Sequence, residues 1–230
     1  MSTNLVALNT EEHRNLRLRP LRSEARHFTE IMADEFTAAA ASCPLLLVKN
    51  AETGAFYAGA MFGLKPGENL LADQPREAPP PYRTLDQQRE GFFVAGDEIA
   101  IDPDCPRFSE SDGEPLFDLD GQPSTALRHI QRVLARLVNG KRETEAFIAT
   151  LLRLRLIEPI DITLNFDDGE RLALQGLYTV SIDTLQEIDD ATALDLFRNG
   201  YLRLIYTMAD SLRHVGSLAH RRNHRLTQAA

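Results

Sequence analysis

The chain has 230 residues, of which 43% are hydrophobic and 26% are charged, and this composition is typical of a folded globular protein. It excludes a wholly disordered chain, a collagen-like repeat and a small disulfide-stabilised protein. The net charge of −9 at pH 7 opposes approach to a phosphate backbone, so we do not expect nucleic acid as a partner.

Prolines divide the chain into two halves that should be built differently. Ten of the twelve prolines lie between Pro44 and Pro123, whereas the last 107 residues contain only Pro159. Because proline interrupts helices, we expect short strands and loops first and long helices later. We expect a single domain over 1–230, with an internal division near the proline-rich segment at 72–90.

Two apolar runs in the first half predict a pair of strands. Residues 45–50 and 55–64 are joined by a turn at Gly54, which favours an antiparallel pair. Gly59 and Gly63 lie inside the second run. Glycines in strands commonly mark bulges or a close approach of the backbone, and we interpret these two in that way.

A second hairpin is predicted in the later half of the chain. Residues 161–166 and 171–175 alternate apolar and polar side chains on either side of an Asp-Gly turn at 167–170. Residues 177–182 should continue the same sheet.

Helical periodicity predicts the remaining elements. One amphipathic helix should cover 124–139 and end at Asn139-Gly140, and a second should cover 144–156, so that the two form a helical hairpin. Apolar residues from 194 to 215 indicate one long helix or two abutting helices, with Gly200 as the break. Because hairpins and helices are segregated along the chain, we predict an α+β fold with a largely antiparallel sheet.

Two stretches of opposite charge stand out. The segment 97–120 carries nine acidic residues against the single base Arg107, and the segment 213–225 carries four arginines and no acid. We interpret Asp118-x-Asp120-Gly121 as a turn, because an EF-hand register would place leucines at two ligand positions. The basic segment has two open interpretations, a solvated helix end or an anion-binding arm. The two stretches can also attract each other within the fold or across a homo-oligomer.

No hydrolase, P-loop, dinucleotide, zinc or iron signature occurs, so the sequence predicts neither a cofactor nor a metal site. Cys43 and Cys105 lie far apart without a CxxC partner, and residues 1–20 lack the apolar stretch of a secretory signal. We therefore expect reduced thiols and a cytoplasmic location. The longest uncharged run, 36–48, is too short to cross a bilayer, so we expect no membrane span.

Several polar residues of the early region converge if the N-terminal segment folds over the first strands. Such a group can perform acid/base chemistry or bind a polar ligand, and the alternative is that each side chain is solvated or paired individually. The residues are His13, His27, Asp34, Glu35 and Lys49.

Four stretches resemble the bacterial SapC-like family, which is named after a protein associated with a paracrystalline surface layer. They include PLLLVKNAETGAFYAGAMFGL within 44–71 and LFDLDGQPS at 116–124, and they continue over 144–181 and 197–218. The resemblance covers most of the chain and brings no catalytic residue set.

The resemblance implies a non-catalytic accessory or binding protein with a protein or peptide partner. Such a protein would act in a surface- or uptake-related system, alongside enzymes that modify peptides or small molecules. The competing hypothesis is an enzyme whose acid/base site is built from the N-terminal histidines and carboxylates. The candidate ligand-binding residues are His13, His27, Glu35, Lys49 and Arg83.

Overall fold

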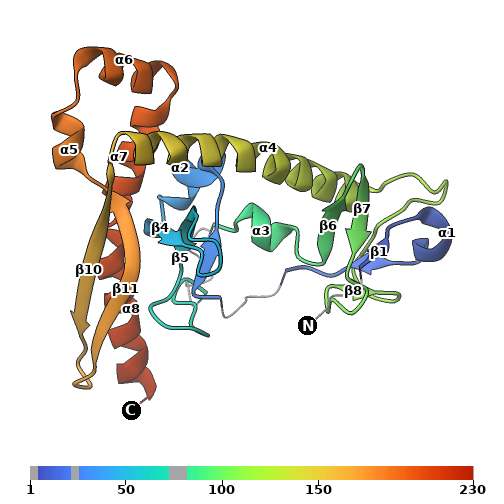
Figure 1. Ribbon diagram of the computed structural model, residues 1–230. Helices are drawn as coiled ribbons and strands as arrows, with labels where there is room; N and C mark the ends of the chain where they lie inside the picture. Colours follow the sequence, from blue (N-terminus) through green and yellow to red (C-terminus); the bar gives the residue numbers. More distant parts are fainter. Residues whose placement is uncertain (1–4, 22–25, 73–81, 230) are drawn as a thin grey trace. The chain divides into compact units, whose positions relative to one another are not determined.

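The computed structural model describes residues 5–21, 26–72 and 82–229 (Figure 1). The chain divides into two compact units, each assembled from two separate stretches of sequence. Unit 1 comprises Met1–Ser23 and Leu85–Asn139, and unit 2 comprises Glu24–Thr84 and Gly140–Ala230. Antiparallel sheets and several helices make up the fold, so the α+β prediction is confirmed. A single domain over 1–230 stays a prediction.

Unit 1 contains two small antiparallel sheets and the first half of a long helix. One sheet has the order β1 (Val6–Ala7), β7 (Glu98–Ile101), β6 (Phe92–Ala95), and the other has the order β8 (Phe108–Ser109), β2 (Arg17–Leu18), β9 (Glu114–Pro115). Two short helices complete it, α1 (Thr10–His13) and α3 (Leu85–Gln88). Its own hydrophobic core is centred on Phe92, Ile101, Leu116 and Ile130.

Unit 2 is built on one five-stranded antiparallel sheet. The strand order is β10 (Ile157–Asn165), β11 (Arg171–Val180), β4 (Leu45–Lys49), β5 (Phe56–Met61), β3 (Phe28–Glu30). Both predicted hairpins are therefore confirmed, one as β4–β5 and the other as β10–β11. The predicted continuation after residue 177 is the last part of β11, which pairs with β4.

The two glycines of the first hairpin lie where the backbone is closely covered. A Cβ atom on Gly59 would lie 2.1 Å from Cε1 of Phe28, because the Phe28 ring lies across this part of β5. A Cβ atom on Gly63 would lie 2.2 Å from the carbonyl oxygen of Glu68. The interpretation of these glycines as points of close approach is confirmed.

The predicted helical hairpin is wrong, because residues Thr125–Arg153 form one continuous helix, α4. Gly140 does not end the helix. It lies beside Met32, where a Cβ atom would come within 2.8 Å of the Met32 Cβ, so glycine serves packing here. The hydroxyl of Thr144 donates to the Gly140 carbonyl and accepts from the Ala33 amide, at 2.7 and 2.8 Å.

The end of α4 also differs from the prediction. Arg155 adopts a left-handed conformation with φ of 56°, and the amides of Arg155 and Leu156 donate back to the carbonyls of Leu152 and Leu151. This is the hydrogen-bond pattern of a Schellman cap, and the helix ends at Arg153 instead of the predicted residue 156. Pro159 lies in the edge strand β10, where one missing N–H is tolerated.

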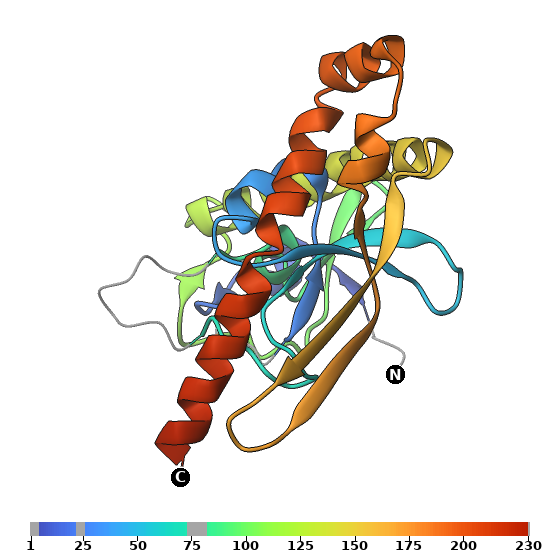
Figure 2. The same ribbon diagram turned by 90° about the vertical axis from the view of Figure 1, so that its left-hand side faces the viewer.

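The remaining helices of unit 2 are short, apart from the last. They are η1 (Ala33–Glu35), α2 (Phe36–Ala39), α5 (Ile182–Gln186), α6 (Asp190–Arg198), α7 (Tyr201–Ser211) and α8 (His214–Ala229). Gly200, with φ of 74°, separates α6 from α7, so the predicted break is confirmed. Helix α8 runs beside the β10–β11 hairpin (Figure 2). Among the helices of the described chain, none combines the length and apolar character needed to cross a membrane.

Candidate functional site

Unit 2 has a pocket at the turn end of the β4–β5 hairpin, which we call the hairpin pocket. Its volume is about 630 Å³, which lies in the range of small-ligand sites. The walls come from the 50–55 turn and its flanking strands, from β3, and from one face of α4. The α4 residues Lys141, Thr144, Glu145 and Ile148 recur at helical spacing, so a single stripe of the helix faces the pocket.

Three aromatic residues, Phe28, Phe56 and Tyr57, are among those that line the hairpin pocket. Phe28 and Tyr57 form an edge-to-face pair with ring centroids 6.2 Å apart. Phe56 alternates with Tyr57 along β5, so it faces the other side of the sheet, where its ring lies 4.9 Å from that of Tyr178. Phe28, Phe56 and Tyr57 therefore give the pocket part of its apolar surface, whereas Tyr178 is not among its lining residues.

Two lysines line the hairpin pocket, although lysine is scarce in this chain. Only three of the 25 basic residues are lysines, and the third, Lys65, pairs with Glu170 outside the pocket. The Lys49 ammonium group lies 5.0 and 5.2 Å from the ring centroids of Phe56 and Tyr178, which holds it by cation–π attraction. Within the described part of the chain, neither Lys49 nor Lys141 makes an ion pair.

Two carboxylates and a phenol complete the polar lining of the pocket. Glu30 comes from β3 and Glu145 from α4, one helical turn beyond Lys141. Burial raises the pKa of Tyr57, and the negative charge of Glu30 adds to the increase. The Tyr57 hydroxyl is therefore protonated at neutral pH and can donate a hydrogen bond.

Of the residues singled out in the sequence, Lys49 alone lines the hairpin pocket. Glu35 is buried at 1% exposure, where one carboxylate oxygen accepts from the Met32 amide and the other from the Tyr82 hydroxyl, both at 2.8 Å. That carboxylate fixes the turn after β3. Asp34 is exposed and lines a separate pocket.

The histidines and Arg83 lie elsewhere. His13 belongs to unit 1, where its Nδ1 lies 3.2 Å from the Asn9 amide at the start of α1. His27 belongs to unit 2, where its backbone carbonyl accepts from Phe62 and Gly63. Arg83 is exposed and does not line the hairpin pocket.

Sequence reasoning missed most of the pocket, including Phe28, Tyr57, Lys141 and Glu145. One signal in the sequence could have pointed to Lys141. The chain has only three lysines among its 25 basic residues, so each lysine was a candidate for a specific role. The aromatic residues carried no such signal, because aromatic side chains in strands are ordinarily part of a core.

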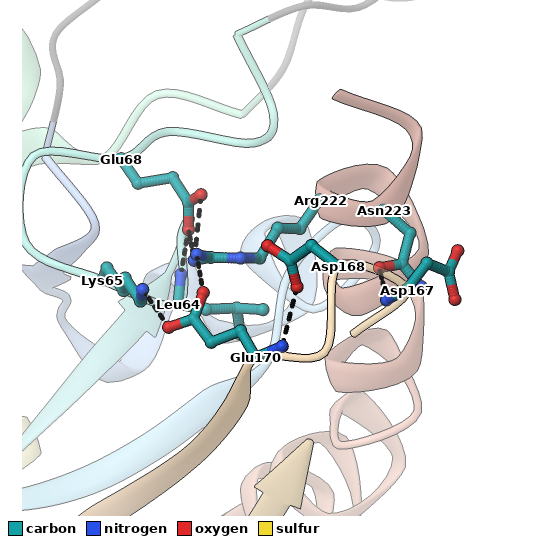
Figure 3. Close-up of polar contacts among 8 residues, drawn as sticks. All are labelled: Leu64, Lys65, Glu68, Asp167, Asp168, Glu170, Arg222 and Asn223. Carbon is teal, nitrogen blue, oxygen red and sulfur yellow. Dashed lines mark hydrogen bonds and ion pairs between the residues drawn. The ribbon is translucent and has the colours of Figure 1, made fainter. Parts of the chain in front are cut away.

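The basic segment at 213–225 forms contacts within unit 2 (Figure 3). Arg222 is 8% exposed and donates to Glu170 at 2.8 Å and to Glu68 at 3.3 Å, while its guanidinium lies 4.8 Å from the Phe166 ring centroid. Lys65 also binds Glu170, and this hydrogen bond is the main reason that the pKa of Glu170 is lowered. We call Glu68, Glu170, Arg222 and Lys65 the α8 charge cluster.

Two other arginines of this segment contact the same loop. Arg221 and Arg225 donate to the backbone carbonyls of Leu70 and Asn69. The segment therefore joins α8 to the loop after β5, which neither of the two sequence interpretations included.

The acidic turn of unit 1 has the geometry that the sequence predicted. The Asp118 carboxylate accepts hydrogen bonds from the amides of Asp120 and Gln122, at 3.0 and 2.8 Å. This is the hydrogen bonding of an Asx turn, so the turn interpretation is confirmed. Across the residues that the structure describes, no group of three or more histidines, cysteines or acidic residues is arranged to hold a metal ion.

Both cysteines are buried and free, one in each unit. Burial raises the pKa of the Cys43 thiol to about 12, and it also raises that of Cys105. At neutral pH both thiols are therefore protonated and poorly nucleophilic.

Comparison with models of known protein families assigns the chain to a family. The SapC family model matches residues 8–218, which is most of the sequence. The chain belongs to the SapC family. No curated protein and no solved structure matches this SapC chain, so the roles of its residues rest on the geometry above.

Proposed function

We propose that this SapC-family protein is an accessory binding protein and that its ligand site is the hairpin pocket. The observation that carries the proposal is that Lys49 and Lys141 both line this concave pocket and make no ion pair within the described residues. Ammonium groups that pair with no carboxylate in the described part of the chain are available to an incoming ligand.

The walls of the pocket are held in place by contacts that need no ligand. The Phe28 ring lies over Gly59, and the Thr144 hydroxyl joins α4 to the turn after β3 through the Ala33 amide. Lys49 is positioned by two rings. A site whose side chains are already oriented loses little entropy on binding, which favours a binding role.

The family resemblance supplies the context of the proposal. We infer a peptide, a protein or a small molecule as the partner, in a surface- or uptake-related system. The accessory role would be contradicted by pull-downs from the native cell that recover neither an envelope protein nor a modifying enzyme.

The binding function is tested by saturation-transfer NMR on the full chain with a mixed panel of amino acids, short peptides, aromatic carboxylates and sugars. We expect at least one class to bind and to lose its signal in the double variant Lys49→Gln/Lys141→Gln. Lys65→Gln is the matched control, because it makes the same change outside the pocket and should retain binding. Absence of binding at millimolar concentration, or binding that the double variant retains, would contradict the proposal.

A further inference from the structure

We propose that unit 2 holds a second binding site, for a phosphate monoester, in the separate pocket that Asp34 lines. This pocket has a volume of about 510 Å³, and its walls come from η1, from α4 and from the junction of α6 with α7, so we call it the α6–α7 pocket. The guanidinium groups of Arg142 and Arg203 bind the phosphate oxygens. The α6–α7 pocket and the hairpin pocket have no lining residue in common, so this inference is independent of the function proposed above.

Helix α4 presents a different face to each of the two pockets. Arg142 and Ala146, which line the α6–α7 pocket, are four residues apart and therefore lie one above the other on the helix. The opposite wall is the start of α7, which contributes Arg203. The rings of Phe147 on α4 and Tyr201 on α7 lie 5.3 Å apart between their centroids, so the two helices are in contact beside the pocket. The two arginines thus reach one pocket from two different helices.

Both arginines of the α6–α7 pocket are available to a ligand. They are exposed, and in the described part of the chain neither Arg142 nor Arg203 makes an ion pair. Of the two carboxylates in the pocket lining, Asp34 already has another interaction, which leaves Glu143 alone against two cations. The local balance of charge therefore favours an anionic ligand.

The net charge of −9 does not exclude a small anion from this pocket. Charges farther away than about 8 Å are largely screened at physiological salt, so a ligand inside the pocket meets mainly the charges of the lining. A nucleic acid extends well beyond the pocket and meets the rest of the chain.

The presence of two guanidinium groups favours a phosphate over a carboxylate. One guanidinium donates two parallel hydrogen bonds and can satisfy a whole carboxylate. A phosphate monoester carries three acceptor oxygens and a charge of about −1.5 to −2 at pH 7, so it can accept from both arginines at once. A pocket of this volume also has room for the group that the phosphate esterifies.

The backbone at the start of α7 adds donors to the site that the two arginines define. Gly200 is the N-cap residue of this helix, and no side chain accepts a hydrogen bond there as a cap. The first-turn amides of α7 therefore have no side-chain cap, and they lie at the end of the helix that favours negative charge.

Titration of the ¹⁵N-labelled full chain tests the inference, with amide chemical shifts as the readout. The probes are phosphoserine, inorganic phosphate and acetate. We expect phosphoserine to shift the amides of Gly200 and Arg203 and to bind at least as tightly as inorganic phosphate. Acetate should bind about tenfold more weakly than phosphoserine, because it uses only one of the arginines.

Variants locate the bound phosphate. Arg142→Gln and Arg203→Gln should each weaken phosphoserine binding by about tenfold. Arg153→Gln is the matched control, because it removes an exposed arginine of the same helix outside both pockets and should retain binding. The double variant Lys49→Gln/Lys141→Gln should also retain it. Circular dichroism verifies that each variant is folded.

Three kinds of result overturn the inference. If phosphoserine causes no shift near Gly200 at millimolar concentration, or if either arginine can be replaced without loss, the α6–α7 pocket is not a phosphate site. If acetate binds as tightly as phosphoserine, or only inorganic phosphate binds, the assignment to a monoester is wrong. If the double lysine variant abolishes binding, the phosphate lies in the hairpin pocket, and the function proposed for that pocket stands without this second site.

Discussion

The hairpin pocket and the α8 charge cluster are two groups of charges in unit 2 that are organised in opposite ways. In the cluster, Arg222 is buried and each of its terminal nitrogens contacts a carboxylate. In the pocket, Lys49 and Lys141 are exposed and make no ion pair in the described chain. A buried, paired charge acts on folding, whereas an exposed charge in a concave site is available for binding.

The type of basic residue in each group follows the same division. The cluster uses an arginine where two carboxylates are reached at once, and the planar guanidinium suits that geometry. The pocket uses lysines, whose ammonium groups are compact and rotate freely. The role of a basic residue in this chain therefore depends on its partners and not on how many basic residues lie nearby.

The largest effect should come from the core that both regions share. Helix α7 packs against β4 and β11, and Leu204 on α7 is only 7% exposed. Leu204→Ala should lower the free energy of unfolding by about 2–5 kcal/mol, because it leaves a cavity. Urea denaturation measures the change. Leu194→Ala, at a position that is 46% exposed, should cost less than about 0.5 kcal/mol. Equal effects of the two variants would show that this face of α7 is not buried.

Removing the central cation of the α8 charge cluster should be the next largest effect. Arg222→Ala leaves Glu68 and Glu170 without their shared partner, and we expect a loss of about 3 kcal/mol in the free energy of unfolding. The exposed Arg213 provides the control, since Arg213→Ala should change stability by less than about 0.5 kcal/mol. Ligand binding in the hairpin pocket should be unaffected by either substitution, because neither residue lines that pocket. If Arg222→Ala left the free energy of unfolding unchanged, the α8 charge cluster would not stabilise the fold, and it would not differ from the hairpin pocket in this respect.

A substitution beneath the Phe28 ring tests the hairpin pocket in the same way. Gly59→Ala places a Cβ atom where the Phe28 ring lies, so the ring must move. We expect a loss of about 1–3 kcal/mol in the free energy of unfolding, together with weaker ligand binding. Gly216→Ala is the control, because nothing lies near its Cβ position within α8, and it should stabilise the protein by up to about 1 kcal/mol. Unchanged binding by Gly59→Ala would show that Phe28 is not part of the site.

The smallest effect should be the pH dependence of the α8 charge cluster. The pKa of Glu170 is lowered from its ordinary value of 4.5, chiefly by the hydrogen bond from Lys65. Because the folded state favours the ionised form, this stabilisation is present above pH 4.5 and is lost as the pH falls through the lowered pKa. Thermal melts between pH 3 and pH 7 should show that the melting temperature falls below pH 4.5. This fall should be smaller in the Glu170→Gln variant than in the unmodified protein. An identical acid profile in both proteins would contradict this assignment.

Local sequence was sufficient for the elements that local physics controls. The Asp-Gly turn at 167–170 fixed the second hairpin, and Gly200 broke the C-terminal helices, because each requires only a backbone conformation that neighbouring residues favour. The segregation of hairpins from helices was likewise sufficient for the α+β class.

Tertiary structure decided the remainder. Gly140 looks like a helix end in the sequence, but its packing against Met32 requires the absence of a side chain, and α4 continues through it. Of the pocket, the sequence singled out Lys49 alone, because the other groups come from β3 and from α4, far along the chain. Strand register and the packing of one helix face brought Glu30, Tyr57 and Lys141 together, and neither is encoded within a short stretch of sequence.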